Sequence, residues 1–116
     1  MDVLFINPGN ASGIYQELSN EYSAIEPPTW SLLLAQSCRD IGYKVGILDA
    51  SAEKLSHQEV VDRIGELQPR LICFVVYGQN VNAGTASMAG AVSLSNYIKK
   101  ANVKTPLSYV GSHIQA

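Results

Sequence analysis

The fold of this chain is decided by one apolar stretch at residues 71–77, which reads Leu-Ile-Cys-Phe-Val-Val-Tyr and stops at Gly78. A continuous run of β-branched and aromatic residues is typical of a strand buried on both faces, as in a parallel sheet. Three further apolar runs occur at residues 3–6, 45–48 and 107–110. We therefore predict four strands in one parallel sheet.

Segments with helical periodicity separate these runs, and we predict helices over residues 30–41, 56–67 and 83–101. The second begins with Ser56 and Glu59, spaced as in a capping box, in which each side chain accepts a hydrogen bond from a backbone N–H of the first turn. In the first helix, Trp30 is expected to anchor the helix in the core. Its apolar residues recur every three or four positions and are expected to face inward: Trp30, Leu33, Leu34, Cys38 and Ile41.

Strands that alternate with helices predict an α/β fold, here a three-layer, Rossmann-like (flavodoxin-like) parallel sheet of order 2-1-3-4. A fifth strand would be expected beside the fourth, but the chain ends at Ala116. We therefore expect residues 1–116 to be a single domain, truncated before the fifth strand and forming the N-terminal part of a longer protein. Strands three and four would lack a helix on the side of the first helix, which makes this bare face a candidate surface for oligomer formation.

Composition and charge exclude several classes of function. Eight Lys and Arg residues against ten Asp and Glu give a net charge of −2, without the basic patch that nucleic-acid binding requires. No apolar run reaches the roughly 20 residues of a membrane span, and no signal peptide is present, so a cytoplasmic setting is expected. Cys38 and Cys73 form neither a disulfide framework nor a metal-ligand motif. We assign no catalytic residue and no metal ligand, and expect the chain alone to catalyse nothing.

Open α/β sheets bind ligands at the carboxyl ends of their strands, where the strand order reverses. The loops that reach this point follow the first, third and fourth strands. They are rich in glycine and amide side chains and nearly free of charge, which suits a large neutral ligand with many amides. The connection at residues 7–29 is also far longer than the usual length of about 2–6 residues, which favours a binding role. The candidate binding residues of these loops are Asn7, Pro8, Gly9, Tyr77, Gly78, Gln79, Asn80, Gly111, Ser112 and His113.

Other ligand classes lack their motifs. Neither G-x-G-x-x-G nor G-x-x-x-x-G-K-[ST] occurs, which disfavours a dinucleotide site and a P-loop. Asn7 and Tyr77 stand where a phospho-receiver would carry acidic residues. Asp49, at the end of the second strand, is interpreted as a loop cap. Residues 10–13, Asn-Ala-Ser-Gly, faintly resemble a flavodoxin phosphate loop, so an FMN site stays open.

Together, these motifs resemble the N-terminal cobalamin (B12)-binding domain of radical SAM enzymes. This group includes the anaerobic magnesium-protoporphyrin IX monomethyl ester cyclases and B12-dependent methyltransferases. The resemblance extends over nearly the whole chain. Its motifs lie at residues 3–8 (VLFINP), 26–35 (EPPTWSLLLA), 42–50 (GYKVGILDA), 60–69, 75–77 (VVY) and 110–113 (VGSH).

The resemblance implies that cobalamin lies at the carboxyl edge of the sheet, with its nucleotide tail beside the small-residue helix at Gly84. It also implies a following radical SAM domain of the same polypeptide, with a 4Fe–4S cluster and S-adenosylmethionine, as the partner of this domain. The cysteine triad for that cluster is missing from this chain.

The chain also departs from better-known cobalamin domains. The Asp-x-His-x-x-Gly whose histidine ligates cobalt is replaced by Asn-Pro-Gly-Asn-Ala at residues 7–11, and the typical Gly-Gly by Gly111-Ser112. Two alternatives therefore remain open. One is a flavodoxin-like domain that binds FMN or another phosphate ligand. The other is a degenerate domain that makes protein contacts without a cofactor.

Overall fold

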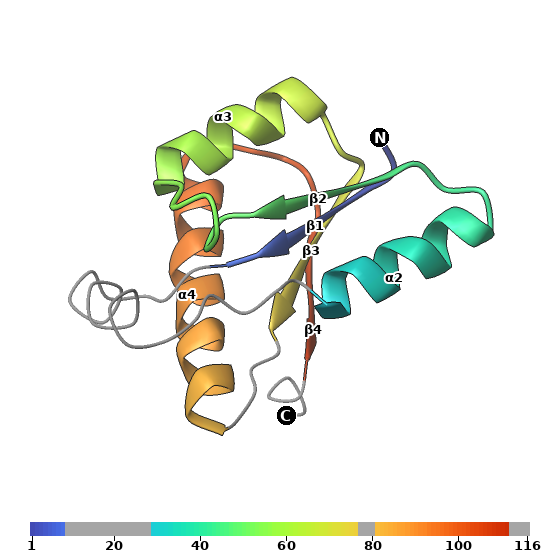
Figure 1. The fold of residues 1–116 in the computed structure, drawn as a ribbon. Helices are drawn as coiled ribbons and strands as arrows, with labels where there is room; N and C mark the ends of the chain where they lie inside the picture. Colours follow the sequence, from blue (N-terminus) through green and yellow to red (C-terminus); the bar gives the residue numbers. More distant parts are fainter. Residues whose placement is uncertain (9–28, 77–80, 112–116) are drawn as a thin grey trace.

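The computed structural model describes residues 1–8, 29–76 and 81–111 and, within its last helix, the side chains from Met88 onward. The predicted strands and helices are confirmed, and their bounds differ from the prediction by at most two residues. Along the chain they are β1 (Val3–Asn7), α2 (Thr29–Asp40), β2 (Val45–Asp49), α3 (His57–Leu67), β3 (Leu71–Val76), α4 (Val81–Lys100) and β4 (Leu107–Gly111) (Figure 1).

The four strands form one parallel sheet in the order β2-β1-β3-β4. Val3 of β1 lies opposite Val45 of β2 and Leu71 of β3, so the central strands are aligned from their first residues. The strand order reverses between β1 and β3, which confirms the predicted Rossmann-like topology.

One face of the sheet carries the larger core, beneath α3 and α4 (Figure 1). The Phe74 ring stacks on the Tyr109 ring of β4 with 5.3 Å between centroids. The Tyr109 hydroxyl lies 2.6 Å from Ser95 Oγ of α4 and forms a hydrogen bond with it. This bond fixes α4 against the edge strand and satisfies a polar group at the border of the core.

The opposite face is packed by α2, which contacts β2 and β1. Its core has three buried residues, Phe5, Ala35 and Val75. Farther along this face, Ser108 and Val110 of β4 are only partly buried. Within the described residues, β4 is an edge strand and its half of this face has no helix of its own, as the sequence predicts.

The predicted inward face of α2 is correct in part. Leu34 and Cys38 pack against the core beneath the helix, as predicted. Trp30 is 50% exposed, Leu33 54% and Ile41 73%, so these three residues do not face inward and Trp30 is not a core anchor. The fully buried residues of α2 are Ser31 and Ala35, which are one helical turn apart and share a face. Because both side chains are small, they let the helix backbone approach the sheet closely.

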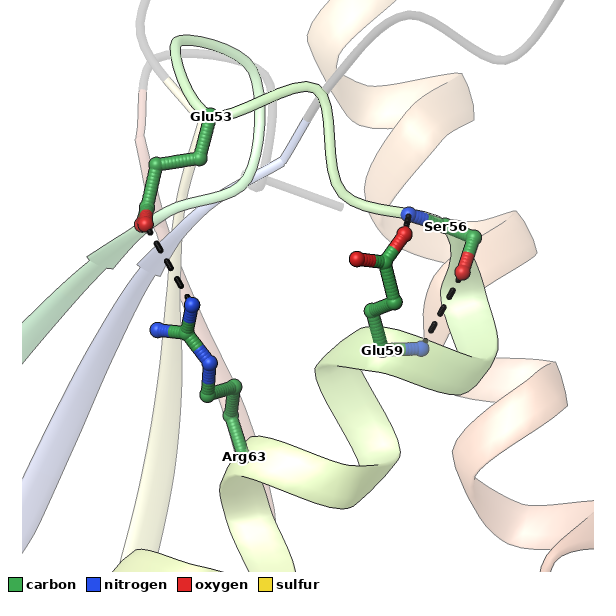
Figure 2. Close-up of polar contacts among 4 residues, drawn as sticks. All are labelled: Glu53, Ser56, Glu59 and Arg63. Atoms are coloured by element: carbon green, nitrogen blue, oxygen red, sulfur yellow. Dashed lines mark hydrogen bonds and ion pairs between the residues drawn. The ribbon is translucent and has the colours of Figure 1, made fainter.

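The capping box at the start of α3 is confirmed (Figure 2). The Glu59 N–H donates to Ser56 Oγ at 3.1 Å, and the Ser56 N–H donates to Glu59 Oε1 at 3.1 Å. These two bonds use N–H groups that would otherwise lack an acceptor at a helix start. Nearby, Arg63 and Glu53 form a half-exposed ion pair at 3.6 Å (Figure 2).

Both cysteines are free, and each is partly rather than fully buried against the core under α2. Burial raises the pKa of the Cys73 thiol above its ordinary value. A hydrogen bond with Ser108 opposes this shift, and the nearby Cys38 adds slightly to it. Among the described helices, none combines the length and apolar character of a membrane span.

Candidate functional site

The carboxyl edge of the sheet lies between two helices on opposite faces. α2, which follows β1 in the chain, lies on one face, and α4, which follows β3, lies on the other (Figure 1). β1 and β3 are neighbours, and ligands in open α/β sheets bind beyond the carboxyl ends of such a pair, where the strand order reverses. Both α2 and α4 begin at this edge.

Asn7, a predicted binding residue, joins the ends of β1 and β2. Its Nδ2 donates a hydrogen bond to Asp49 Oδ1 at 2.9 Å. The same Asp49 oxygen accepts from the Ala52 N–H at 3.0 Å, which confirms that Asp49 caps the loop after β2. The Asn7 carbonyl oxygen accepts from the Ala50 N–H at 3.0 Å. One donor of the Asn7 amide is thus used within the protein, and the buried Pro8 follows directly.

Gly111, also a predicted binding residue, ends β4 opposite Val76 of β3. A Cβ atom at this position would lie against the Val76 carbonyl group, 2.7 Å from its carbon. Real Cβ contacts essentially never approach so closely, so strand packing by itself requires glycine here. Glycine at this position is therefore explained by the sheet, whether or not a ligand is bound.

Of the other predicted binding residues, the structure describes the position of Gly84 in α4. Gly84 lies in the first turn of α4, at the same edge as the ends of β1, β3 and β4. The edge thus brings Asn7, Pro8, Gly84 and Gly111 to one side of the molecule. The remaining candidates lie outside the described residues: Gly9, Tyr77, Gly78, Gln79, Asn80, Ser112 and His113.

Sequence reasoning missed Ser31, the third residue of α2. Its side chain is 1% exposed, and its Oγ has no hydrogen-bond partner within the described part of the chain. The signal was present in the spacing of Ser31 and Ala35, two small residues four apart in a helix that is otherwise rich in leucine. Bulky apolar residues dominated the periodicity and concealed the close-packed face.

The described edge is poor in chemically reactive groups. Asp49 is its charged residue at a strand end, and its carboxylate accepts hydrogen bonds from Asn7 and Ala52. In residues 1–8, 29–76 and 81–111, no three His, Cys, Asp or Glu side chains are grouped so as to hold a metal ion.

Comparison of the chain with protein-family models, with curated proteins and with solved structures finds no match. The likeness to cobalamin-binding domains therefore rests on the motifs of the sequence, and the fold rests on the topology described above.

Proposed function

We propose that this domain binds cobalamin at the carboxyl edge of its sheet and presents it to a radical SAM domain in a longer polypeptide. The observation that carries the proposal is the reversal of strand order between β1 and β3 at an edge with little charge. Cobalamin is bulky and bears many amides, so it suits loops that offer amide donors and acceptors in place of ions. A reducing, cytoplasmic setting belongs to the same proposal.

In this proposal the domain orients the cofactor and shields it from water, while bound cobalamin supplies the methyl-transfer or radical chemistry. Asn7 and Pro8 would support one side of the corrin, and the glycine-containing first turn of α4 would let the ligand approach the backbone at Gly84. None of the described residues at the edge is a histidine that would ligate cobalt from below. The iron–sulfur cluster and S-adenosylmethionine would belong to the radical SAM domain.

The test is to mix the full chain with hydroxocobalamin, desalt it and record the visible spectrum. We expect the corrin absorption to remain with the protein, and the double substitution Gln79→Ala, Asn80→Ala to reduce it. Gln36→Ala is the matched control, because it removes an exposed amide on α2 whose Nε2 donates a hydrogen bond to its helix neighbour Asp40 at 2.7 Å. A colourless wild-type protein would overturn the proposal, and a parallel incubation with FMN tests the flavodoxin-like alternative.

A second candidate function, protein contact without a cofactor, is favoured by the exposed flank of α2, formed by Trp30, Leu33 and Ile41. Trp30 and Leu33 are three residues apart and lie on one side of the helix, and Ile41 follows directly after its last residue. Leu34, on the border of that side, packs against the core that contains Val75 of β3.

This candidate predicts that the full chain associates with itself. Sedimentation velocity should then detect a dimer at micromolar protein concentration, and the double variant Leu33→Ser, Ile41→Ser should sediment as a monomer. A wild-type protein that stays monomeric at every concentration would exclude self-association through this flank.

A further inference from the structure

The charges of this chain are separated along its sequence. All ten Asp and Glu residues lie within residues 1–66, whereas residues 67–116 contain no carboxylate side chain and four cations: Arg70, Lys99, Lys100 and Lys104. The first part has four cations against its ten carboxylates, so its net side-chain charge is −6. The second part has a charge of +4, although the whole chain carries only −2.

The fold also separates these charges in space. The described part of the cationic segment forms β3, α4 and β4, at one end of the sheet order β2-β1-β3-β4. Lys99 and Lys100 end α4, and Lys104 lies in the connection from α4 to β4 (Figure 1). We call residues 99–104 the basic turn. A cationic surface therefore lies on the β4 side of the molecule.

The basic turn is fixed to the core at both ends. Ile98 is fully buried, and Val103 packs against the same core. The Val103 N–H donates a hydrogen bond to the Ile98 carbonyl oxygen at 3.4 Å. All three lysines of the turn are exposed, and none of them forms an ion pair within the described part of the chain. Their charges are thus held on a fixed backbone and are not neutralised by a described carboxylate.

Helix stability explains only part of this charge. Cations in the last turn of a helix interact favourably with its dipole, which accounts for Lys99 and Lys100. Lys104 lies beyond the end of α4, and Arg70 lies directly before β3, at the same end of the paired strands β3 and β4. The contact of Arg70 with Asp2 is 3.9 Å long and largely exposed, and such pairs contribute little. Neither Lys104 nor Arg70 is explained by a helix or by a strong ion pair.

The surroundings of the basic turn distinguish between anionic partners. Single-stranded nucleic acid binds by stacking its bases on aromatic rings. The nearest aromatic residue in the sequence, Tyr97, is partly buried and donates its hydroxyl to Gln58 of α3 at 2.7 Å. A membrane surface requires apolar side chains that insert into it, and none of the large exposed apolar side chains described lies in residues 99–106. The carboxylates of a protein partner require only exposed cations, so an acidic segment fits this surface best.

We propose that the basic turn docks an acidic segment of a partner protein, with the lysine ammonium groups facing the carboxylates of that segment. The proposal does not rest on cobalamin binding. The basic turn precedes β4 and lies at the amino ends of β3 and β4, whereas the proposed cofactor site lies at the carboxyl edge. Both sites can therefore be occupied at once.

The test is a titration of the ¹⁵N-labelled full chain with a hexaglutamate peptide that has blocked ends, followed by NMR at low salt. We expect saturable shifts of the amides of residues 99–105, with a dissociation constant of about 1 mM or below. Lys104→Gln should weaken binding about twofold, and the triple variant that adds Lys99→Gln and Lys100→Gln about tenfold. Salt at about 0.15 M should weaken binding to the wild type, because exposed charges are screened.

Lys54→Gln is the matched control for Lys104→Gln. Lys54 is also an exposed lysine outside the helices, but it follows β2 in the acidic part of the chain. This variant should bind hexaglutamate as the wild type does. Because Lys104 is exposed and lies beyond α4, the spectrum of Lys104→Gln without peptide should match that of the wild type and show that the variant is folded.

The proposal is overturned if hexaglutamate shifts no amide of the basic turn, or if Lys104→Gln and Lys54→Gln bind the peptide equally well. Oligothymidylate of similar charge and vesicles that contain phosphatidylserine test the other anionic partners. If either binds the basic turn more tightly than hexaglutamate does, the turn is a nucleic-acid or membrane site and the proposal fails. A chain that binds hexaglutamate at the turn but not cobalamin would overturn the proposed function alone.

Discussion

At the scale of single residues, two glycines of this chain are constrained in opposite ways. A Cβ at Gly111 would collide with the Val76 carbonyl group, whereas one at Gly65 in α3 would meet no atom within 4 Å. We expect Gly111→Ala to lower the free energy of unfolding by about 2 kcal/mol or more, since strand backbone must move to admit the methyl group. Gly65→Ala should raise it by roughly 0.5–1 kcal/mol, because alanine is the better helix former.

Urea unfolding followed by circular dichroism measures both changes on the same scale. Gly65→Ala serves as the matched control, since it adds the same methyl group at a site with free space. Equal stability of the Gly111→Ala and wild-type proteins would show that the pairing of β3 and β4 at Val76 is looser than the structure indicates.

The Cys73 thiol gives the protein a pH-dependent stability. Burial raises its pKa in the folded state above the ordinary value of 9.0, which applies to the unfolded chain. Below that value both states are protonated, so this residue contributes no pH dependence. As pH rises above it, the unfolded chain loses its thiol proton first, which favours unfolding and lowers the stability.

We therefore expect the wild type to lose stability more steeply than Cys73→Ala as the pH rises above 9.0, the ordinary pKa of this thiol. Thermal midpoints measured at a series of pH values in one buffer system give the comparison. A wild type and a variant with parallel curves would show that the thiol titrates alike in the folded and unfolded states.

Residue-level prediction from the sequence succeeded where the cause was local and failed where it depended on register. The loop-cap role of Asp49 was predictable, because its partner Ala52 is three residues away. The bond from Asn7 to Asp49 joins residues 42 positions apart and exists because β1 and β2 pair in register. The local sequence around Asn7 does not show that the pairing of β1 with β2 brings Asp49 within hydrogen-bond distance of the Asn7 amide.

At the scale of elements, the start of α3 allows two kinds of polar contact to be compared. Ser56→Ala removes the acceptor of the Glu59 N–H and should cost about 1 kcal/mol of stability. Arg63→Met removes a half-exposed ion pair with Glu53 while keeping the aliphatic stem, and it should cost less than about 0.5 kcal/mol. Thermal unfolding of both variants, at low salt and at about 0.5 M salt, tests which of the two loses more stability.

The salt dependence supplies the control for this pair of variants. The small effect of Arg63→Met should vanish at high salt, because exposed ion pairs are screened, whereas the effect of Ser56→Ala should persist. A larger loss in Arg63→Met than in Ser56→Ala would contradict the assignment of the capping box as the main polar contact at this helix start.

The elements differ in how well their sequences predict their orientation. In α3 the apolar residues Val60 and Ile64 are one helical turn apart and both are buried, although Leu67 is 38% exposed at the end of the helix. In α2 the buried residues are the small Ser31 and Ala35. Leu34 packs against the core, but the equally bulky Leu33 is exposed. Periodicity locates a helix reliably, but it does not show which side lies inward when the contact is made by small side chains.

At the scale of the whole molecule, the sheet order was predictable because continuous apolar runs mark buried parallel strands and crossovers are right-handed. The position of the candidate site followed, since ligands of open α/β sheets bind where the strand order reverses. The detail of the site did not follow, because seven of the eleven predicted binding residues lie outside the described part of the chain. Loop conformation depends on contacts that neither strand pattern nor topology specifies.

Because the cores on the two faces of the sheet differ in size, we expect the helices on the two faces to differ in their free energy of local unfolding. Among the side chains that the structure describes, twelve buried residues form the core beneath α3 and α4, and three form the core beneath α2. Since local stability follows buried apolar contact, α2 should open at a lower free energy than the rest of the molecule. We expect native-state hydrogen exchange in low urea to show this difference between the amides of residues 35–40 and those of residues 94–98. The contrary result is that the α2 amides exchange only with global unfolding, at the free energy found for α4. The smaller core would then be as cooperative as the larger one, and α2 would not open independently of the rest of the molecule.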